Sequence, residues 1–166
     1  MKGKKLWLLA IIVIVCLTGM FGYGIFQTQA ADEVPLPEDI TIVPPSPDLP
    51  KEIAAFSGKW QGTWIIAKGR REKNPRKAVL IVEEIDKQEA KIIYAFGPYS
   101  GARELKGWYK RFKAKVTPGA TTKIEFVTKD KSEFSFEMKK DLNSLGAYYI
   151  TGESSMKYST GFERFD

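Results

Sequence analysis

An alternation of apolar and polar residues begins at Trp60 and constrains the fold more than any other feature of this sequence. It starts in the motif Gly58-Lys59-Trp60-Gln61-Gly62-Thr63-Trp64, where a glycine stands two residues before each tryptophan. A period of two puts both tryptophans on one face of a β-strand. The folded part is therefore predicted to open with a strand that carries large rings on its inner face and allows close backbone approach at its glycines.

The same period continues to the C-terminus in short runs separated by turn residues. The predicted strands are 59–66, 77–85, 90–96, 107–116, 122–127, 132–138, 146–151 and 154–165. No stretch after residue 56 has the pattern of an amphipathic helix, and residues 51–56 fit a single helical turn. The fold class is all-β: eight strands with short links most simply form an antiparallel up-and-down barrel. A two-sheet β-sandwich is the alternative.

One predicted strand differs from the rest. Most strands alternate between an apolar and a polar face, which is the pattern of antiparallel sheets with one face in water. Residues Val79 to Val82 are apolar at every position. This strand is therefore predicted to be covered on both faces.

The first thirty residues carry an export signal. Lys2, Lys4 and Lys5 precede an apolar run from Leu6 to Phe26 that has no charged residue. The run is close to the ~20 residues that span a bilayer, and the small residues before Ala31 suit a cleavage site. Residues 1–30 are thus either a cleaved signal peptide or a hydrophobic helix that anchors the chain in the membrane. Both alternatives predict a periplasmic or extracellular protein, in the second case tethered to the inner membrane by residues 6–26.

Residues 31–50 form an acidic, proline-rich linker, and residues 51–166 form the β-barrel domain. The linker has six prolines, at 35, 37, 44, 45, 47 and 50. Proline fixes φ and removes a backbone donor, so neither helix nor sheet can continue through this segment. It is predicted to be an extended spacer at ~3.1 Å per residue.

The composition removes most catalytic chemistry. The chain has no histidine, and its one cysteine, Cys16, lies in the apolar N-terminal run. The usual nucleophile–base pairs, the commonest metal ligand and an internal disulfide are therefore missing. Glu83 and Glu84 are adjacent on a strand and face opposite ways, so they cannot act as the acid pair of a glycan hydrolase. We therefore expect a monomeric protein without catalytic residues, metal or cofactor.

Two binding modes remain open. In the first, a small apolar or aromatic ligand lies in the barrel lumen against the rings of Trp64, Tyr94, Trp108, Phe112, Phe126 and Phe136, with Tyr149 as a further lining residue. The same rings can instead fill the core. In the second, an anionic envelope glycan, a lipid or a partner protein binds the basic loop through Arg70, Arg71, Lys73 and Arg76. A solvated loop is the alternative there. Nucleic acid is not an expected partner outside the cell.

The motif Gly58-Lys59-Trp60 resembles the Gly-x-Trp motif of the lipocalins and avidins, the calycin barrels. This resemblance implies an eight-stranded barrel in which a basic residue near the end of the last strand packs on the tryptophan. Arg164 stands at that place, so Trp60 and Arg164 are expected to close one barrel end. The motif Trp60-Gln61-Gly62-Thr63-Trp64 with the later strands up to Gly97 also resembles an uncharacterised family of bacterial exported domains, which implies a fold and a compartment.

Overall fold

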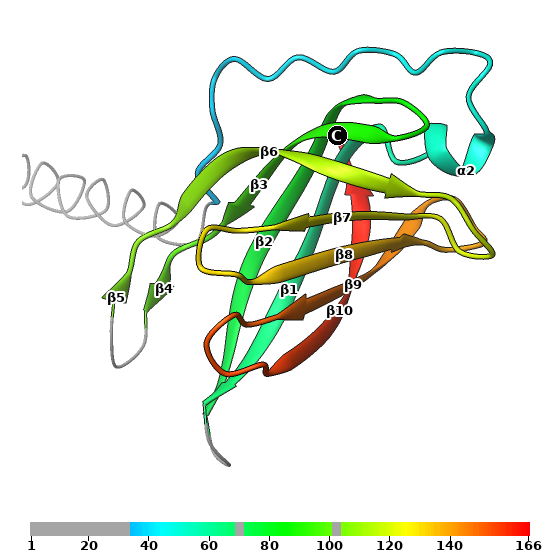
Figure 1. Cartoon of the computed structure of the whole chain (residues 1–166). Coiled ribbons are helices and arrows are strands. Elements are labelled where there is room, and N and C mark those ends of the chain that lie inside the picture. The colour runs from blue at the N-terminus through cyan, green and yellow to red at the C-terminus, as the bar shows by residue number, and fades with distance from the viewer. Residues whose placement is uncertain (1–33, 69–71, 101–103) are drawn as a thin grey trace, which may run out of the picture. The chain divides into compact units, whose positions relative to one another are not determined.

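The alternating pattern folds into a closed barrel. The computed structural model describes residues 34–68, 72–100 and 104–166. One short helix, α2 (Lys51–Ala54), precedes ten strands (Figure 1). The strands are β1 (Gly58–Lys68), β2 (Glu72–Ile85), β3 (Glu89–Phe96), β4 (Tyr99–Ser100), β5 (Glu104–Leu105), β6 (Trp108–Thr117), β7 (Lys123–Val127), β8 (Glu133–Met138), β9 (Ser144–Ile150) and β10 (Lys157–Phe165).

Eight of these strands match the eight predicted ones and form a single sheet. Their order around the barrel is β1-β10-β9-β8-β7-β6-β3-β2, and β2 returns to β1. All neighbours are antiparallel, so the chain runs up and down around the wall. The predicted barrel is confirmed, and the sandwich is excluded because the sheet closes on itself. The other two strands, β4 and β5, form a small ladder within the connection from β3 to β6.

Helix α2 covers one end of the barrel, as the predicted helical turn at 51–56 allows. Ile53 and Phe56 are 2% and 0% exposed and pack in the same core as the inward-facing strand residues. The carbonyl of Pro50 accepts hydrogen bonds from the backbone N–H groups of Ile53 and Ala54. A proline suits this place, because its fixed φ fits a helix start and its missing donor would be unpaired there.

The first and last strands are joined at this covered end by Trp60 and Arg164. The guanidinium carbon of Arg164 lies 4.2 Å from the centre of the Trp60 ring. The same guanidinium donates to the carbonyl oxygens of Ser57 and Ala55 at 2.8 and 2.6 Å. The Trp60 indole donates to the carbonyl of Phe56 at 2.8 Å. The contact implied by the Gly-x-Trp resemblance is present, and it ties both chain ends of the barrel to α2.

The glycines of the opening motif make these contacts possible. Gly58 has a φ of +120°, and a Cβ on it would lie 2.6 Å from Nη1 of Arg164. A Cβ on Gly62 would lie 2.6 Å from the carbonyl oxygen of Gly161 and would collide with the Phe162 ring. A side chain at position 58 would displace the Arg164 guanidinium and strain the backbone, and one at position 62 would separate β1 from β10.

Residues 34–43, called the strap below, lie along the outer wall of β2 and β3. They have no helix or strand, as predicted, but they pack against the barrel rather than standing apart from it. Their apolar side chains cover an outward-facing cluster on the wall, with Val34, Leu36, Ile40 and Ile42 packed on Val79, Ile81, Ile93 and Ala95. The predicted two-sided cover of Val79 to Val82 is thus confirmed.

Polar contacts also hold the strap. The backbone N–H of Val43 donates to the carbonyl of Glu83 at 2.8 Å, and Arg111 donates to the Asp39 carboxylate at 2.8 Å. The guanidinium of Arg111 also reaches the Glu83 carboxylate at 3.3 Å. Figure 1 shows the segment running along the barrel to α2.

Within the described ranges, no helix is long and apolar enough to cross a bilayer. The predicted signal peptide or anchor, residues 1–30, lies outside those ranges and includes Cys16.

Candidate functional site

The barrel end opposite α2, called the mouth below, has an incompletely paired wall. Strand β6 pairs with β3 over eight residues, from Trp108 to Lys115. It pairs with β7 over only three, from Lys115 to Thr117. Residues 108–114 of β6 therefore have no ladder partner on the β7 side. On the inner face of this part of the wall Lys110 is exposed and Trp108 and Phe112 are half-buried, whereas Ala114 is buried.

The exposure of Lys110 shows that opening. Lys110 is the register partner of Tyr94, whose ring is fully buried inside the barrel. Direct cross-strand partners share a face of the sheet, so Lys110 belongs to the inner face, between Trp108 and Phe112. It is nevertheless exposed, and its two ring neighbours are half-buried. The Lys110 ammonium lies 5.6 Å from the centre of the Trp108 ring.

A run of stacked rings crosses five neighbouring strands at the mouth. Successive rings have centroid distances of 4.7, 4.9, 4.5 and 5.6 Å and interplanar angles of at most 28°, in the order Phe112, Phe126, Phe134, Tyr149 and Tyr158. The last four are direct register partners on β7 to β10. Phe126 and Phe134 are buried, whereas Phe112, Tyr149 and Tyr158 are half-buried. This aromatic shelf offers partly exposed ring surface to a molecule at the mouth.

Phe96 connects the shelf to the opposite side of the mouth. Its ring lies 5.4 Å from Trp108, 6.3 Å from Phe134 and 6.5 Å from Tyr149, measured between centroids. The guanidinium carbon of Arg76 lies 4.5 Å from the centre of the same ring. Arg76 is the register partner of the inward-facing Trp64, which places it on the inner face as well.

Arg76 is half-buried and is held mainly through Nε. This nitrogen donates to the carbonyl of Gly97 at 2.8 Å, and Nη2 reaches the carbonyl of Lys106 only at 3.5 Å. Among the side chains that the structure describes, no carboxylate forms an ion pair with Arg76. Burial lowers the pKa of Arg76, and the nearby Tyr94 and Tyr149 partly offset that shift.

The deeper predicted ligand contacts pack against one another. Trp64, Tyr94 and Phe136 are 0% exposed. The Trp64 indole donates to the Tyr94 hydroxyl at 2.7 Å over the inner face of β2, and the Tyr94 ring lies 4.8 Å from Phe134 and 5.8 Å from Phe136. Burial raises the pKa of Tyr94 well above its usual value, so its hydroxyl stays neutral. Of the six predicted lumen residues, Trp108 and Phe112 are the two with exposed ring surface.

The predicted anion contacts are only partly covered by the structure. Arg70 and Arg71 lie outside the described residues, and the side chain of Lys73 is not described either. Arg76 is therefore the one predicted anion contact whose position is known. Two outward cations of β6 are ion-paired: Arg111 with Asp39 and Glu83, and Lys113 with Glu89 at 3.0 Å.

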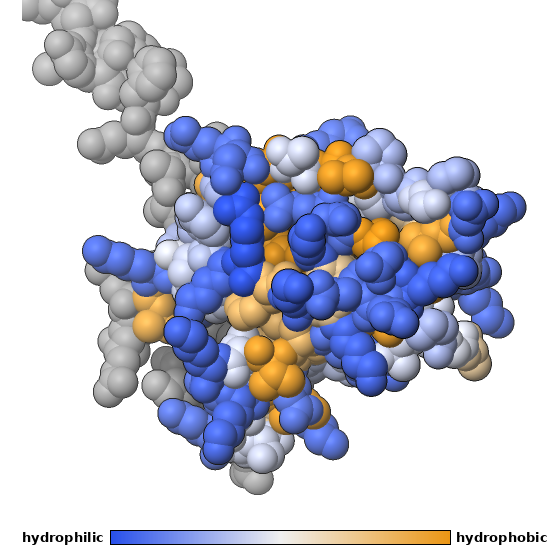
Figure 2. Space-filling view, turned by 45° about the horizontal axis from the view of Figure 1, so that its top comes forward, coloured by the Kyte–Doolittle hydropathy of each residue, from blue (hydrophilic) through white to orange (hydrophobic). Residues whose placement is uncertain are grey.

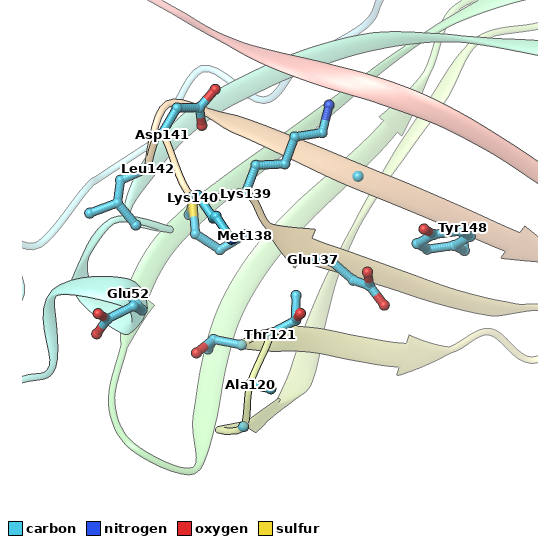
Figure 3. A pocket seen from close by; sticks show the side chains of 13 residues that line it. Glu52, Ala120, Thr121, Glu137, Met138, Lys139, Lys140, Asp141, Leu142 and Tyr148 are labelled. Carbon is cyan, nitrogen blue, oxygen red and sulfur yellow. The ribbon is translucent and has the colours of Figure 1, made fainter.

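A surface hollow lies elsewhere, on the outside of the barrel near α2 (Figure 3). It has a volume of about 780 Å³ and is lined by the turns after β6 and β8 together with Glu52, Glu137 and Tyr148. Lysines and acids both face it, and none of the predicted site residues lines it. On the face shown in Figure 2 the surface is mainly hydrophilic, with apolar side chains in small separate patches.

The acidic residues of the described part of the chain lie in separate places. No group of three acidic or cysteine side chains there is placed to hold a metal ion. Glu84 is paired with Lys91 outside the barrel, and Glu83 is paired with Arg111 under the strap. The two adjacent glutamates were predicted to face opposite ways, and this is wrong: both lie on the outer face, because the register shifts between Val82 and Glu84.

Comparison of the sequence with protein families and with curated proteins finds no match. The resemblance to the calycins is therefore one of architecture: a closed antiparallel barrel of eight strands, consistent with a lipocalin-like fold.

Sequence reasoning grouped Trp108, Phe112 and Tyr149 as lumen rings, but it assigned Arg76 to a separate anion site on the basic loop. It missed Tyr158 and Lys110 as members of the same mouth. Both lie on the inward-facing positions of their strands, so the period of two was the signal that identifies them. Their exposure could not be predicted. For Lys110 it depends on how far β7 extends beside β6, and for Tyr158 on where the pairing of β10 with β1 ends.

Proposed function

We propose that this protein is a non-catalytic binding module that holds a small apolar or aromatic ligand at the mouth of its barrel. The observation that supports this most is the partly exposed aromatic surface on the inner face, from Trp108 and Phe112 on β6 to Tyr149 and Tyr158 on β9 and β10. Partly exposed rings on the inside of a closed barrel are apolar surface that remains in contact with water after folding. A ligand that covers them gains ~25 cal/mol per Å² of apolar area removed from water.

The deep lumen does not fit such a ligand equally well. Its rings are fully buried and in mutual contact, and moving them apart would cost packing energy. The proposed ligand therefore lies on the aromatic shelf and against Trp108, above the Trp64–Tyr94 pair. The basic N-terminus and the apolar run at residues 6–26 support a periplasmic or extracellular location for this binding.

The test uses phenylnaphthylamine, a neutral aromatic probe whose emission can be excited by energy transfer from tryptophan. The full chain is titrated with the probe, and Trp108→Leu is compared with the matched control Tyr109→Leu. Tyr109 is the next residue on β6, is 43% exposed and faces outward. We expect saturable binding that Trp108→Leu weakens at least fivefold and Tyr109→Leu leaves unchanged. Absence of saturable binding, or equal effects of both variants, would refute the proposal.

A further inference from the structure

We infer that the ligand at the mouth carries an anionic group, a carboxylate, sulfonate or phosphate on an apolar body, and that Arg76 binds this group. The inference rests on the proposed function and adds the chemical class of the ligand. Four observations carry it: the place of Arg76 beside the aromatic shelf, its burial, its spare donors and a second cation at the same opening.

Arg164 and Arg76 each stack on an aromatic ring, but they differ in how many N–H donors remain for a ligand. At the covered end, Arg164 lies on Trp60 and uses both Nη atoms in short bonds to backbone carbonyls. At the mouth, Arg76 lies on Phe96 in a similar way, but its one short bond comes from Nε. A guanidinium has five N–H donors. Among the described residues, Arg76 has one short and one long acceptor contact, so its Nη groups keep donors for a ligand.

The burial of Arg76 favours an anion at this place. A positive charge that is taken partly out of water loses hydration, and an opposite charge restores the balance. No described carboxylate supplies that charge. The planar fork of a guanidinium matches an oxyanion with two parallel hydrogen bonds.

Lys110 adds a second positive charge on the same inner face. It is linked to Arg76 through the contacting rings of Trp108 and Phe96. It is exposed and, among described residues, has no ion-pair partner, whereas its outward neighbours Arg111 and Lys113 are paired. An amphipathic anion that enters between β6 and β7 would therefore meet rings and cations together.

The test compares two probes that share their aromatic rings. Anilinonaphthalene sulfonate is anionic, and phenylnaphthylamine is its neutral counterpart. Both are titrated into the full chain and into Arg76→Gln, Lys110→Gln and the control Lys113→Gln. Lys113 lies on the same strand as Lys110 but faces outward. We expect Arg76→Gln to weaken sulfonate binding by about tenfold or more, since charged hydrogen bonds are the strong ones. Lys110→Gln should weaken it by a smaller factor, and Lys113→Gln should leave it unchanged.

Binding of the neutral probe should stay within twofold of the wild type in all three variants. If sulfonate binding does not change in Arg76→Gln, or if both probes weaken equally, the anionic class is wrong while the proposed function stands. If neither probe binds the wild type, the proposed function fails and the inference with it. Should Arg76→Gln not fold, Arg76→Lys keeps the charge but not the fork, and it must still weaken the sulfonate and not the neutral probe.

A competition experiment then replaces the probes by simple amphiphiles. Decanoate and decanol have the same chain length and differ in charge. Decanoate should displace bound sulfonate probe at a lower concentration than decanol from the wild type, and this preference should disappear in Arg76→Gln. Equal displacement by both compounds from the wild type would overturn the inference.

Discussion

The buried hydrogen bond between Trp64 and Tyr94 offers a sharp test of the packed lumen. It joins β1 to β3 over the inner face of β2 at 2.7 Å, with both side chains fully buried. Tyr94→Phe removes the hydroxyl and leaves the indole N–H of Trp64 without its acceptor. An unsatisfied buried donor costs about 1–3 kcal/mol, so the free energy of unfolding should fall by about 2 kcal/mol.

Substitution of the hydrogen-bond partner Trp64 shows whether the cost of Tyr94→Phe comes from the lost hydrogen bond. Trp64→Phe removes the donor and part of the ring, so it should cost more than Tyr94→Phe because a cavity is added. In the Trp64→Phe background the Tyr94 hydroxyl has already lost its partner. Removing it there should cost less than about 0.5 kcal/mol, which gives a coupling energy of about 1–2 kcal/mol for the pair.

The assay is urea unfolding of the four chains, followed by circular dichroism because two of them lack Trp64. Tyr148→Phe is the control, since Tyr148 is 45% exposed and a surface change of this kind stays within about 0.5 kcal/mol. For a folded unit of this size, 2 kcal/mol corresponds to roughly 8 °C in Tm. Equal costs of Tyr94→Phe in both backgrounds would show that the two side chains are not coupled, and the description of the lumen core would be wrong.

Three further results are expected. Arg164→Met keeps the apolar stem but loses the contact with Trp60 and both hydrogen bonds to carbonyl oxygens. Urea unfolding should show that the free energy of unfolding falls by about 2–3 kcal/mol, against almost no change for Lys59→Met. An unchanged unfolding midpoint would show that Arg164 does not close the barrel. Ile40→Asp should release the strap, seen as faster hydrogen exchange at residues 34–43 with the barrel intact, and unchanged exchange would show that this packing does not hold it. Hydrogen bonds from Thr128 and Ser132 lower the pKa of Asp130, so the contribution of Asp130 to stability is present above about pH 4 and is lost as the pH falls through the lower folded pKa. When Tm is measured from neutral to acidic pH, it should therefore fall less for Asp130→Asn than for the wild type. Parallel Tm curves of the two chains would contradict this prediction.

The closure of the barrel was predictable from the residues themselves. Trp60 and Arg164 stand at the two ends of the folded part, and the Gly-x-Trp resemblance pairs them. The glycines at 58 and 62 were expected to permit close approach, and Cβ atoms there would indeed collide with β10. These predictions hold because each depends on one strand face and on the first and last strands being neighbours.

The strap could be predicted only in part. Four apolar positions at Val79 to Val82 showed that something must cover the outer face. The proline-rich segment was not identified as that cover, because proline patterns tell where regular structure ends and not what the chain then touches. Apolar residues between the prolines, such as Ile40 and Ile42, were the available signal.

The sequence alone determined most strand faces, because side-chain direction in a regular strand follows a period of two, and the bulge between Val82 and Glu84 is an exception. It also determined that no histidine side chain is available for acid–base chemistry or metal binding, since histidine is missing from the whole sequence. Only the tertiary structure decided which rings are buried and which remain exposed. The exposure of each ring depends on how far β7 extends beside β6 and on the register that places Arg76 over Phe96. It also depends on the contact between rings from opposite walls of the barrel. These are long-range pairings, and their geometry exists only once the sheet has closed.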